Sequence, residues 1–396
     1  DSVWPKYTEG HKRIESDNLY HERNKNIRAT AAGEWIDQLG LNNTIALRKV
    51  VKEPQLLGDV LSEVIKEKDE ILAICECLKF DHEADFSFIQ AFIRAKSLKE
   101  GIGWVKEMVH ILEKNGYDAK AISNLLVSVG PSKEIWTYVD SLSEDQQEAY
   151  WKNEHLYLFV ETSHDAIDMI NKLHRYGRFF SAIELCSRSV DTLPTDLLLK
   201  VLWRASIEDS NEDVRLDNYV IGSIFDELYK RDNLDVSLMK KIEWNYISFL
   251  DSHSIRKPKY LENELAENPS FFIEVIKWIY FSDDRDKYYK EKEGVSEEKI
   301  QLIARHSKLL LDTWQKIPGL QDDYSIDEGF LKGWIETVRE LATEAGRQEV
   351  ADMEIGRLLA RYPEDVDKWP QESIFRIIED LHSEELNRHY STTLFN

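Results

Sequence analysis

Glutamate and histidine alternate near the C-terminal end of the chain at spacings that could hold a metal ion. Glu379, His382, Glu385 and His389 stand at positions i, i+3, i+6 and i+10. One continuous helix over this stretch would place all four side chains along one face. Helical bundles hold paired metal ions with Glu-x-x-His on facing helices. A metal-binding helical enzyme is therefore one interpretation of this stripe.

The competing interpretation of the stripe is a charged face in contact with solvent. A bundle site needs a second Glu-x-x-His on a facing helix. Among the other histidines, His155, His174 and His306 lack a glutamate three residues earlier, whereas Glu107/His110 and Glu161/His164 have that spacing. We predict no metal site and no cofactor, and we keep the stripe as the alternative.

A second acidic cluster, Asp81-His82-Glu83-Ala84-Asp85, admits a metal loop or a helix cap. Acidic side chains in the first turn of a helix are stabilised by the helix dipole. The apolar residues that follow, beginning at Phe86, have helical spacing. We expect the cluster to cap the helix that starts there.

The common catalytic signatures are missing from the sequence. It contains no G-x-x-x-x-G-K-[ST] phosphate loop, no G-x-S-x-G, no HExxH and no CxxC. The cysteines are Cys75, Cys77 and Cys186, an odd number that favours a reducing compartment. No apolar run approaches the roughly 20 residues of a membrane span. We predict a cytoplasmic, non-enzymatic protein without membrane contact. Because the chain begins at Asp1 without Met, we also expect it to be part of a larger polypeptide.

The elements that carry these residues are expected to be helices throughout. Apolar residues recur at three- and four-residue intervals from Gly33 onward, and strand-like alternation is missing. Only 16 Gly and 9 Pro occur, fewer than a sheet protein of this length usually needs. The later helices are predicted at about 235–252, 296–315, 327–344, 348–361 and 371–386. The fold class is therefore all-α, with stacked antiparallel helical hairpins in an irregular α-solenoid.

The predicted organisation has four parts. Residues 1–30 form a polar entry segment, residues 31–282 a helical-repeat array, and residues 299–396 a C-terminal helical sub-array. Between the last two lie residues 283–298, which are mostly charged and are interpreted as a loop or boundary.

A glycine that ends one helix is followed five residues later by an alanine in the next helix. The pattern occurs at Gly116/Ala121, Gly177/Ala182 and Gly346/Ala351. Glycine permits a tight turn, and the small alanine lets two antiparallel helices approach closely. A proline follows twelve residues after the alanine in two of the copies, at Pro194 and Pro363.

These residues resemble the tetratricopeptide repeat. The match is best between residues 166 and 194, where Met169, Leu173, Gly177, Phe179, Ala182, Ser189 and Pro194 fit the motif, although its first-helix Trp is missing. Shorter matches lie between residues 108 and 128 and between 338 and 363. The copies are not separated by multiples of 34 residues, so the array is degenerate. More loosely, the chain resembles helical regions of large multidomain bacterial proteins, some of which serve in defence systems.

The resemblance implies a scaffold that binds a protein or peptide, or other domains of the same polypeptide. A net charge of −23 repels phosphate backbones and anionic lipid, and no Lys/Arg run indicates a basic groove, which argues against a nucleic-acid sensor, the third interpretation. The tryptophans beside apolar helical positions are expected in the core rather than in a ligand groove; they are Trp136, Trp151, Trp203, Trp244, Trp278, Trp314 and Trp334.

Overall fold

The computed structural model describes residues 27–79, 83–153, 156, 162–208, 217–250, 256–280, 296–321, 323–360 and 370–394. Over these residues the chain is all-α, which confirms the predicted fold class, and the β pairing there is one isolated bridge between Leu320 and Ile326. None of the helices described is both long enough and apolar enough to span a bilayer. The contacts divide the chain into two compact units, which we call unit 1 (described residues up to Leu185) and unit 2 (from Cys186).

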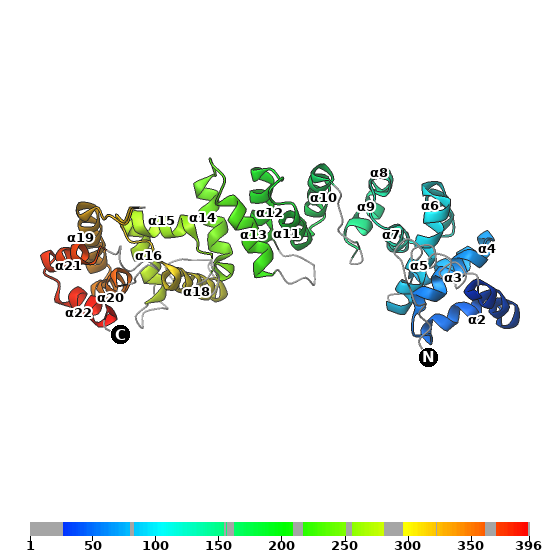
Figure 1. The fold of residues 1–396 in the computed structure, drawn as a ribbon, viewed down its shortest axis with the longest axis horizontal. Helices are drawn as coiled ribbons and strands as arrows, with labels where there is room; N and C mark the ends of the chain where they lie inside the picture. Colours follow the sequence, from blue (N-terminus) through cyan, green and yellow to red (C-terminus); the bar gives the residue numbers. More distant parts are fainter. Residues whose placement is uncertain are drawn as a thin grey trace, which may run out of the picture. The chain divides into compact units, whose positions relative to one another are not determined.

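In unit 1, from α4 onward, the helices alternate between the first and the second member of successive hairpins. After a helix over residues 27–39 come α2 (Leu41–Ala46), the short 3-10 helix η1 (Leu47–Lys49), α3 (Pro54–Val64), α4 (Lys68–Cys75), the 3-10 helix η2 (Glu76–Lys79), α5 (Glu83–Glu100), α6 (Ile102–Lys114), α7 (Ala119–Val129), α8 (Lys133–Val139), α9 (Glu144–Trp151), α10 (Ser163–Arg175) and most of α11 (Phe179–Arg188). Helix α3 packs on α5, α5 on α7, and α7 on α9. Figure 1 shows α6, α8 and α10 along one edge of this unit, with α5, α7 and α9 beside them. We call α4, α6, α8 and α10 the first helices, and α5, α7, α9 and α11 the second helices.

The closest helix packing in unit 1 is between α3 and α5. A Cβ atom on Gly58 would lie 2.1 Å from the main-chain oxygen of Phe88, so only glycine fits there. Around this contact the side chains of Phe88, Phe92 and Leu61 are wholly buried. The sequence analysis did not identify Gly58 as a packing glycine.

The three predicted glycine turns share one backbone geometry. Gly116, Gly177 and Gly346 all adopt the left-handed conformation, with φ of 76°, 76° and 64°. In each turn the amide of the following residue donates to a main-chain oxygen five residues earlier: Tyr117 to Leu112 (3.1 Å), Arg178 to Leu173 (2.9 Å) and Arg347 to Ala342 (2.7 Å). This is the Schellman helix end. The paired alanines Ala121, Ala182 and Ala351 are buried, as predicted.

Unit 2 continues with α12 (Thr195–Ile207), α13 (Asn218–Leu228), α14 (Val236–Asn245), the 3-10 helix η3 (Ile247–Phe249), α15 (Lys259–Glu267), α16 (Pro269–Ile279), α18 (Glu297–Thr313), α19 (Glu328–Glu344), α20 (Gln348–Leu359), α21 (Gln371–Asp380) and α22 (Glu384–Leu394). Three aromatic rings join α16, α18 and α19: Phe272 lies 5.4 Å from Trp314 and 5.2 Å from Trp334 between ring centroids. Such aromatic contacts add to the stabilisation from buried area.

Five of the seven tryptophans assigned to the core are buried: Trp136, Trp151, Trp278, Trp314 and Trp334. Trp203 and Trp244 are half-buried. The core prediction is therefore confirmed for the first five, and the other two lie at the edge of the core.

A buried carboxylate caps one helix of unit 2. Glu243 of α14 is fully buried and accepts hydrogen bonds from the amides of Tyr260 (3.0 Å) and Leu261 (2.8 Å), at the start of α15. It also accepts one from the Tyr229 hydroxyl at 2.7 Å. Burial raises the pKa of Glu243 to about 7. The residue preceding α15 is Pro258, whose side chain cannot accept such bonds, so Glu243 takes the place of a capping side chain.

Some predicted boundaries differ from the structure. The helix expected at 235–252 ends at Asn245 and is followed by η3. Tyr246, between the two, donates its hydroxyl hydrogen to the main-chain oxygen of Leu202 (3.0 Å). The helix expected at 296–315 is α18, which Ser296 caps. Of the charged segment 283–298, residues 283–295 lie outside the described part, as do residues 1–26 of the entry segment and Pro363.

Substitution by alanine is expected to change stability in opposite directions at two glycines, one within α19 and one just after it. Gly333 lies within the helix and Gly346 ends it at φ 64°, and a Cβ at either position meets no atom within 4 Å. We expect Gly346→Ala to lower the free energy of unfolding by about 1 kcal/mol, because an L-residue is strained there. Gly333→Ala should raise it by about 0.5–1 kcal/mol. Urea unfolding of the two variants measures both, and changes of the same sign would contradict the turn geometry.

Candidate functional site

Lysine side chains connect each first helix of unit 1 to the next. Lys68 of α4 pairs with Glu107 of α6. Lys106 of α6 places its ammonium 5.3 Å from the ring centroid of Tyr138 on α8. From α8 to α10, Lys133 lies 3.5 Å from Asp165. The first helices therefore form a row whose side chains contact one another. We call this the first-helix row.

The larger groove on this row lies between α4 and α6 and measures about 420 Å³; we call it the α4–α6 groove. Its apolar lining comes from Ile71 of α4 and from Trp104, Met108 and Ile111 of α6. Most of these side chains are buried, so they form a floor rather than an exposed patch.

Four lysines surround that floor: Lys66, Lys68, Lys96 and Lys99. Lys96 is 4% exposed, and its ammonium lies 3.2 Å from the carboxylate of Glu100. Lys99 lies 3.1 Å from Glu63. The sequence analysis found no Lys/Arg run that would indicate a basic groove, and packing of α3, α4 and α5 gathers these lysines from positions about 30 residues apart.

A second, smaller groove of about 250 Å³ lies between α8 and α10; we call it the α8–α10 groove. Helix α8 contributes Lys133, Trp136 and Thr137, and α10 contributes His164, Asp165, Ile167, Asp168 and Asn171, with Asp140 following α8. Trp136 and Ile167 supply apolar surface among side chains that are otherwise polar. It therefore offers hydrogen-bonding groups and a place for an apolar side chain together.

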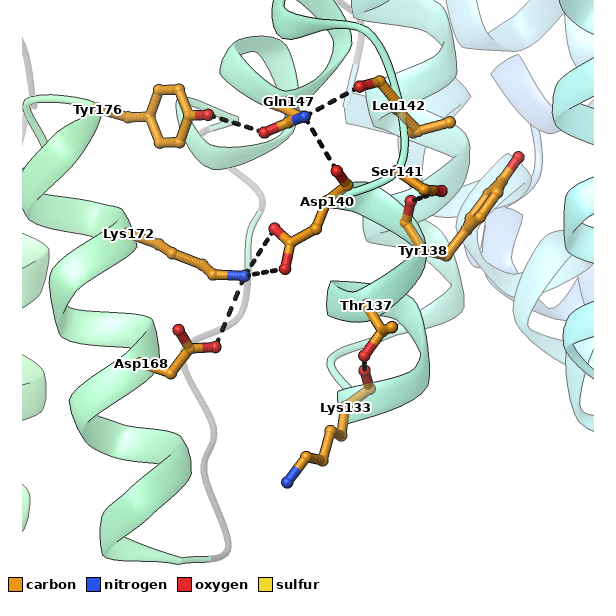
Figure 2. Close-up of polar contacts among 10 residues, drawn as sticks. All are labelled: Lys133, Thr137, Tyr138, Asp140, Ser141, Leu142, Gln147, Asp168, Lys172 and Tyr176. Carbon is orange, nitrogen blue, oxygen red and sulfur yellow. Dashed lines mark hydrogen bonds and ion pairs between the residues drawn. The ribbon is translucent and has the colours of Figure 1, made fainter.

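The α8–α10 groove is held by a polar network around Lys172 (Figure 2). The Lys172 ammonium lies 2.6 and 2.7 Å from the two carboxylate oxygens of Asp140 and 3.6 Å from Asp168. It also lies 5.3 Å from the ring centroid of Trp151. The carboxamide of Gln147 donates to the main-chain oxygen of Leu142 (2.9 Å). These contacts fix the turn between α8 and α9 against α10.

A third depression in unit 1, of about 340 Å³, is almost wholly apolar. Ala31, Trp35, Leu56, Leu57 and Val60 contribute to its lining. It has few polar groups to orient a ligand, which distinguishes it from the two grooves on the first-helix row.

The predicted Glu/His stripe is not on one helix, so that expectation was wrong. Helix α21 ends at Asp380, and His382 takes a left-handed conformation (φ 48°) in the turn before α22. Glu379 stays on α21, whereas Glu385 and His389 lie on α22, 3.7 Å apart. The turn is fixed by Ser383, whose hydroxyl accepts from the Leu386 amide (3.2 Å).

The metal-binding interpretation thereby loses the common helix face on which it depended. Across the part of the chain that the structure describes, no group of three or more His, Cys, Asp or Glu side chains could hold a metal ion. His389 instead packs against α20: a Cβ on Gly356 would lie 2.8 Å from the His389 Cβ.

The described part of the acidic cluster lies at the start of α5, which begins at Glu83, three residues before the start expected at Phe86. Glu83 and Asp85 occupy the first turn of that helix, and Asp85 is buried against the guanidinium of Arg48. Asp81 and His82 lie outside the described residues. The structure therefore shows an ion pair between η1 and α5 that the sequence analysis did not predict.

The three cysteines are buried and unpaired. Burial raises the pKa of the Cys75 thiol to about 12 and that of the Cys77 thiol to about 11. Thiols with such pKa values stay protonated near neutral pH, so they pack as small apolar side chains rather than as nucleophiles.

The network around Lys172 predicts different effects for two lysine substitutions. Lys172→Met should lower the stability of unit 1 by about 1 kcal/mol and speed amide exchange in the α8–α9 turn, because a half-buried ion pair is lost. Lys152→Met removes a pair with Glu148 in which both side chains are about half exposed, and should change stability by less than about 0.5 kcal/mol. Hydrogen exchange read by mass spectrometry measures both. Equal exchange rates in the α8–α9 turn of the two variants would contradict the assignment.

Comparison with known proteins found no match for this chain. No protein-family model matches the chain, and neither a curated protein nor a solved structure matches it. The candidate site therefore rests on the residues and geometry given above.

Proposed function

We propose that this chain is a non-catalytic, tetratricopeptide-like helical-repeat scaffold that mediates protein–protein interaction. In this proposal the first-helix row of unit 1 receives a peptide or domain, either from another protein or from elsewhere in the same polypeptide. The observation that carries the proposal is that two mixed polar and apolar grooves, the α4–α6 groove and the α8–α10 groove, lie along that one row. Helical-repeat arrays bind partners along one surface formed by equivalent helices of successive hairpins.

Two further observations support the repeat assignment. The Schellman turns at Gly116, Gly177 and Gly346 repeat the same hydrogen bonds and are each followed by a buried alanine. The second helices α5, α7 and α9 pack on one another in order, which leaves the first helices to line the other side of each hairpin. We infer a stacked, solenoid-like arrangement of hairpins from these features.

The chemistry of the side chains also favours a binding role. Polar groups in the grooves are held by salt bridges and main-chain contacts, as at Lys172, rather than arranged as a nucleophile beside a base. The buried, unpaired cysteines accord with a reducing compartment, and we place the protein in the cytoplasm on that basis. A role in a bacterial multidomain protein, with defence as one setting, follows from the sequence resemblance alone.

Site-specific photo-crosslinking tests the assignment of the first-helix row. A photoreactive amino acid is introduced at Thr137 in the α8–α10 groove or at Ile111 in the α4–α6 groove, and the matched control is Glu148 on the exposed face of α9. In native lysate we expect Thr137 and Ile111 to crosslink one common protein at least about fivefold more than Glu148. A partner bound along the row would contact the photoreactive side chain in either groove but not the one at Glu148. Equal yields from all three positions would reject the proposal, as would crosslinks from Glu148 alone.

A further inference from the structure

We propose that the α4–α6 groove binds an acidic, partly apolar peptide segment of the partner protein. This inference rests on the proposed binding function of the first-helix row and names the chemistry of the segment that it receives. The occupant is a segment whose carboxylate side chains face the lysines while a neighbouring apolar side chain lies on the groove floor.

The charge of the groove opposes that of the chain. Four lysines line the groove against two glutamates, Glu100 and Glu107, and Glu63 lies beside it, whereas the whole chain carries −23. Complementary charge steers association and selects partners, and most strongly where the surrounding surface has the opposite sign. An acidic segment is therefore attracted to this groove and repelled by most other surfaces of the chain.

Lys96 supplies the most specific contact. An ammonium has three hydrogen-bond donors, and that of Lys96 has the Glu100 carboxylate as its ion-pair partner although the residue is 4% exposed. A nearly buried ammonium with donors to spare is stabilised by a further anionic acceptor. Among the described residues no carboxylate lies within ion-pairing distance of the exposed Lys66, so a second positive charge is available at the rim.

The existing ion pairs do not close the groove. Lys68 and Glu107 are both at least half exposed, and pairs of this kind contribute little to stability. A ligand carboxylate can therefore take over such a lysine at small cost. The Lys99–Glu63 pair, with Lys99 more than half exposed, is of the same kind.

The floor selects against a purely ionic ligand. Trp104 and Met108 lie largely buried beneath the charged walls and make the floor apolar, and tryptophan is enriched among the residues that contribute most to binding. A volume of about 420 Å³ admits a few side chains rather than a nucleic-acid duplex. A peptide that combines acidic and apolar residues matches both the walls and the floor.

The test uses the full chain and defined peptide pools. Dodecapeptides with blocked termini are synthesised with Glu or Asp mixed at random with Leu, Ile or Phe. Two matched pools carry Gln/Asn or Lys in place of the acids. We expect the immobilised chain to retain the acidic pool in preference to both others, and the retention to fall as salt is raised, because the attraction is screened.

Variants then locate the binding. With the best acidic peptide in fluorescence anisotropy at low salt, Lys66→Glu should raise Kd about tenfold, since two units of charge change at the rim. The control Lys241→Glu makes the same change on the exposed face of α14 in unit 2 and should alter Kd less than about twofold. Lys96→Met removes the ammonium, keeps an unbranched side chain of similar size, and should also raise Kd.

Three outcomes would overturn the inference. They are equal retention of the acidic and neutral pools, equal effects of Lys66→Glu and Lys241→Glu, and displacement of the acidic peptide by a single-stranded oligonucleotide at lower concentration than the peptide itself requires. If the acidic pool fails while crosslinks from Thr137 and Ile111 still capture a common protein, the chemistry assigned to the groove is wrong and the binding function stands. If both fail, the binding function fails as well.

Discussion

The left-handed glycine after α6, α10 and α19 is the constraint on which these three hairpins depend. It lets the next amide reach back five residues to a carbonyl, as Arg178 does to Leu173, and so reverses the chain within two residues. The second helix then begins immediately, and a buried alanine such as Ala182 permits close approach to the first. Without the positive φ the turn would lengthen, and the alanine would no longer meet its neighbouring helix.

This turn chemistry also explains what the sequence could predict. The turns at Gly116, Gly177 and Gly346 can be predicted from the sequence, because glycine is the residue that takes positive φ without strain. The turn at His382 uses a residue that rarely adopts that conformation, so the pattern of apolar residues was read through it as one helix. At the break, Tyr246 makes a hydrogen bond to Leu202, 44 residues away, a contact that local spacing does not encode.

The candidate grooves could not be predicted from the sequence for a different reason. The lysines of the α4–α6 groove come from the α3–α4 connection, the start of α4 and the end of α5, so no run of basic residues marks them. A net charge of −23 indicated an acidic surface but not its local exceptions. The tight contact at Gly58, where α3 meets α5, helps to bring these segments together and is visible only once the helices are packed. Fold class thus follows from periodicity, whereas the site follows from tertiary packing.

Hydrogen–deuterium exchange of the whole chain, alone and with its crosslinked partner or best acidic peptide, tests the central claim most directly. The claim is that the second helices of unit 1 form the packed core and the first helices form the binding surface. The account predicts that the partner slows exchange in α4, α6, α8 and α10, that the acidic peptide slows it in α4 and α6, and that both leave α7 and α9 unchanged, because the amides of those two helices are already protected by packing. Slowing confined to α7 and α9, or to unit 2, would contradict it.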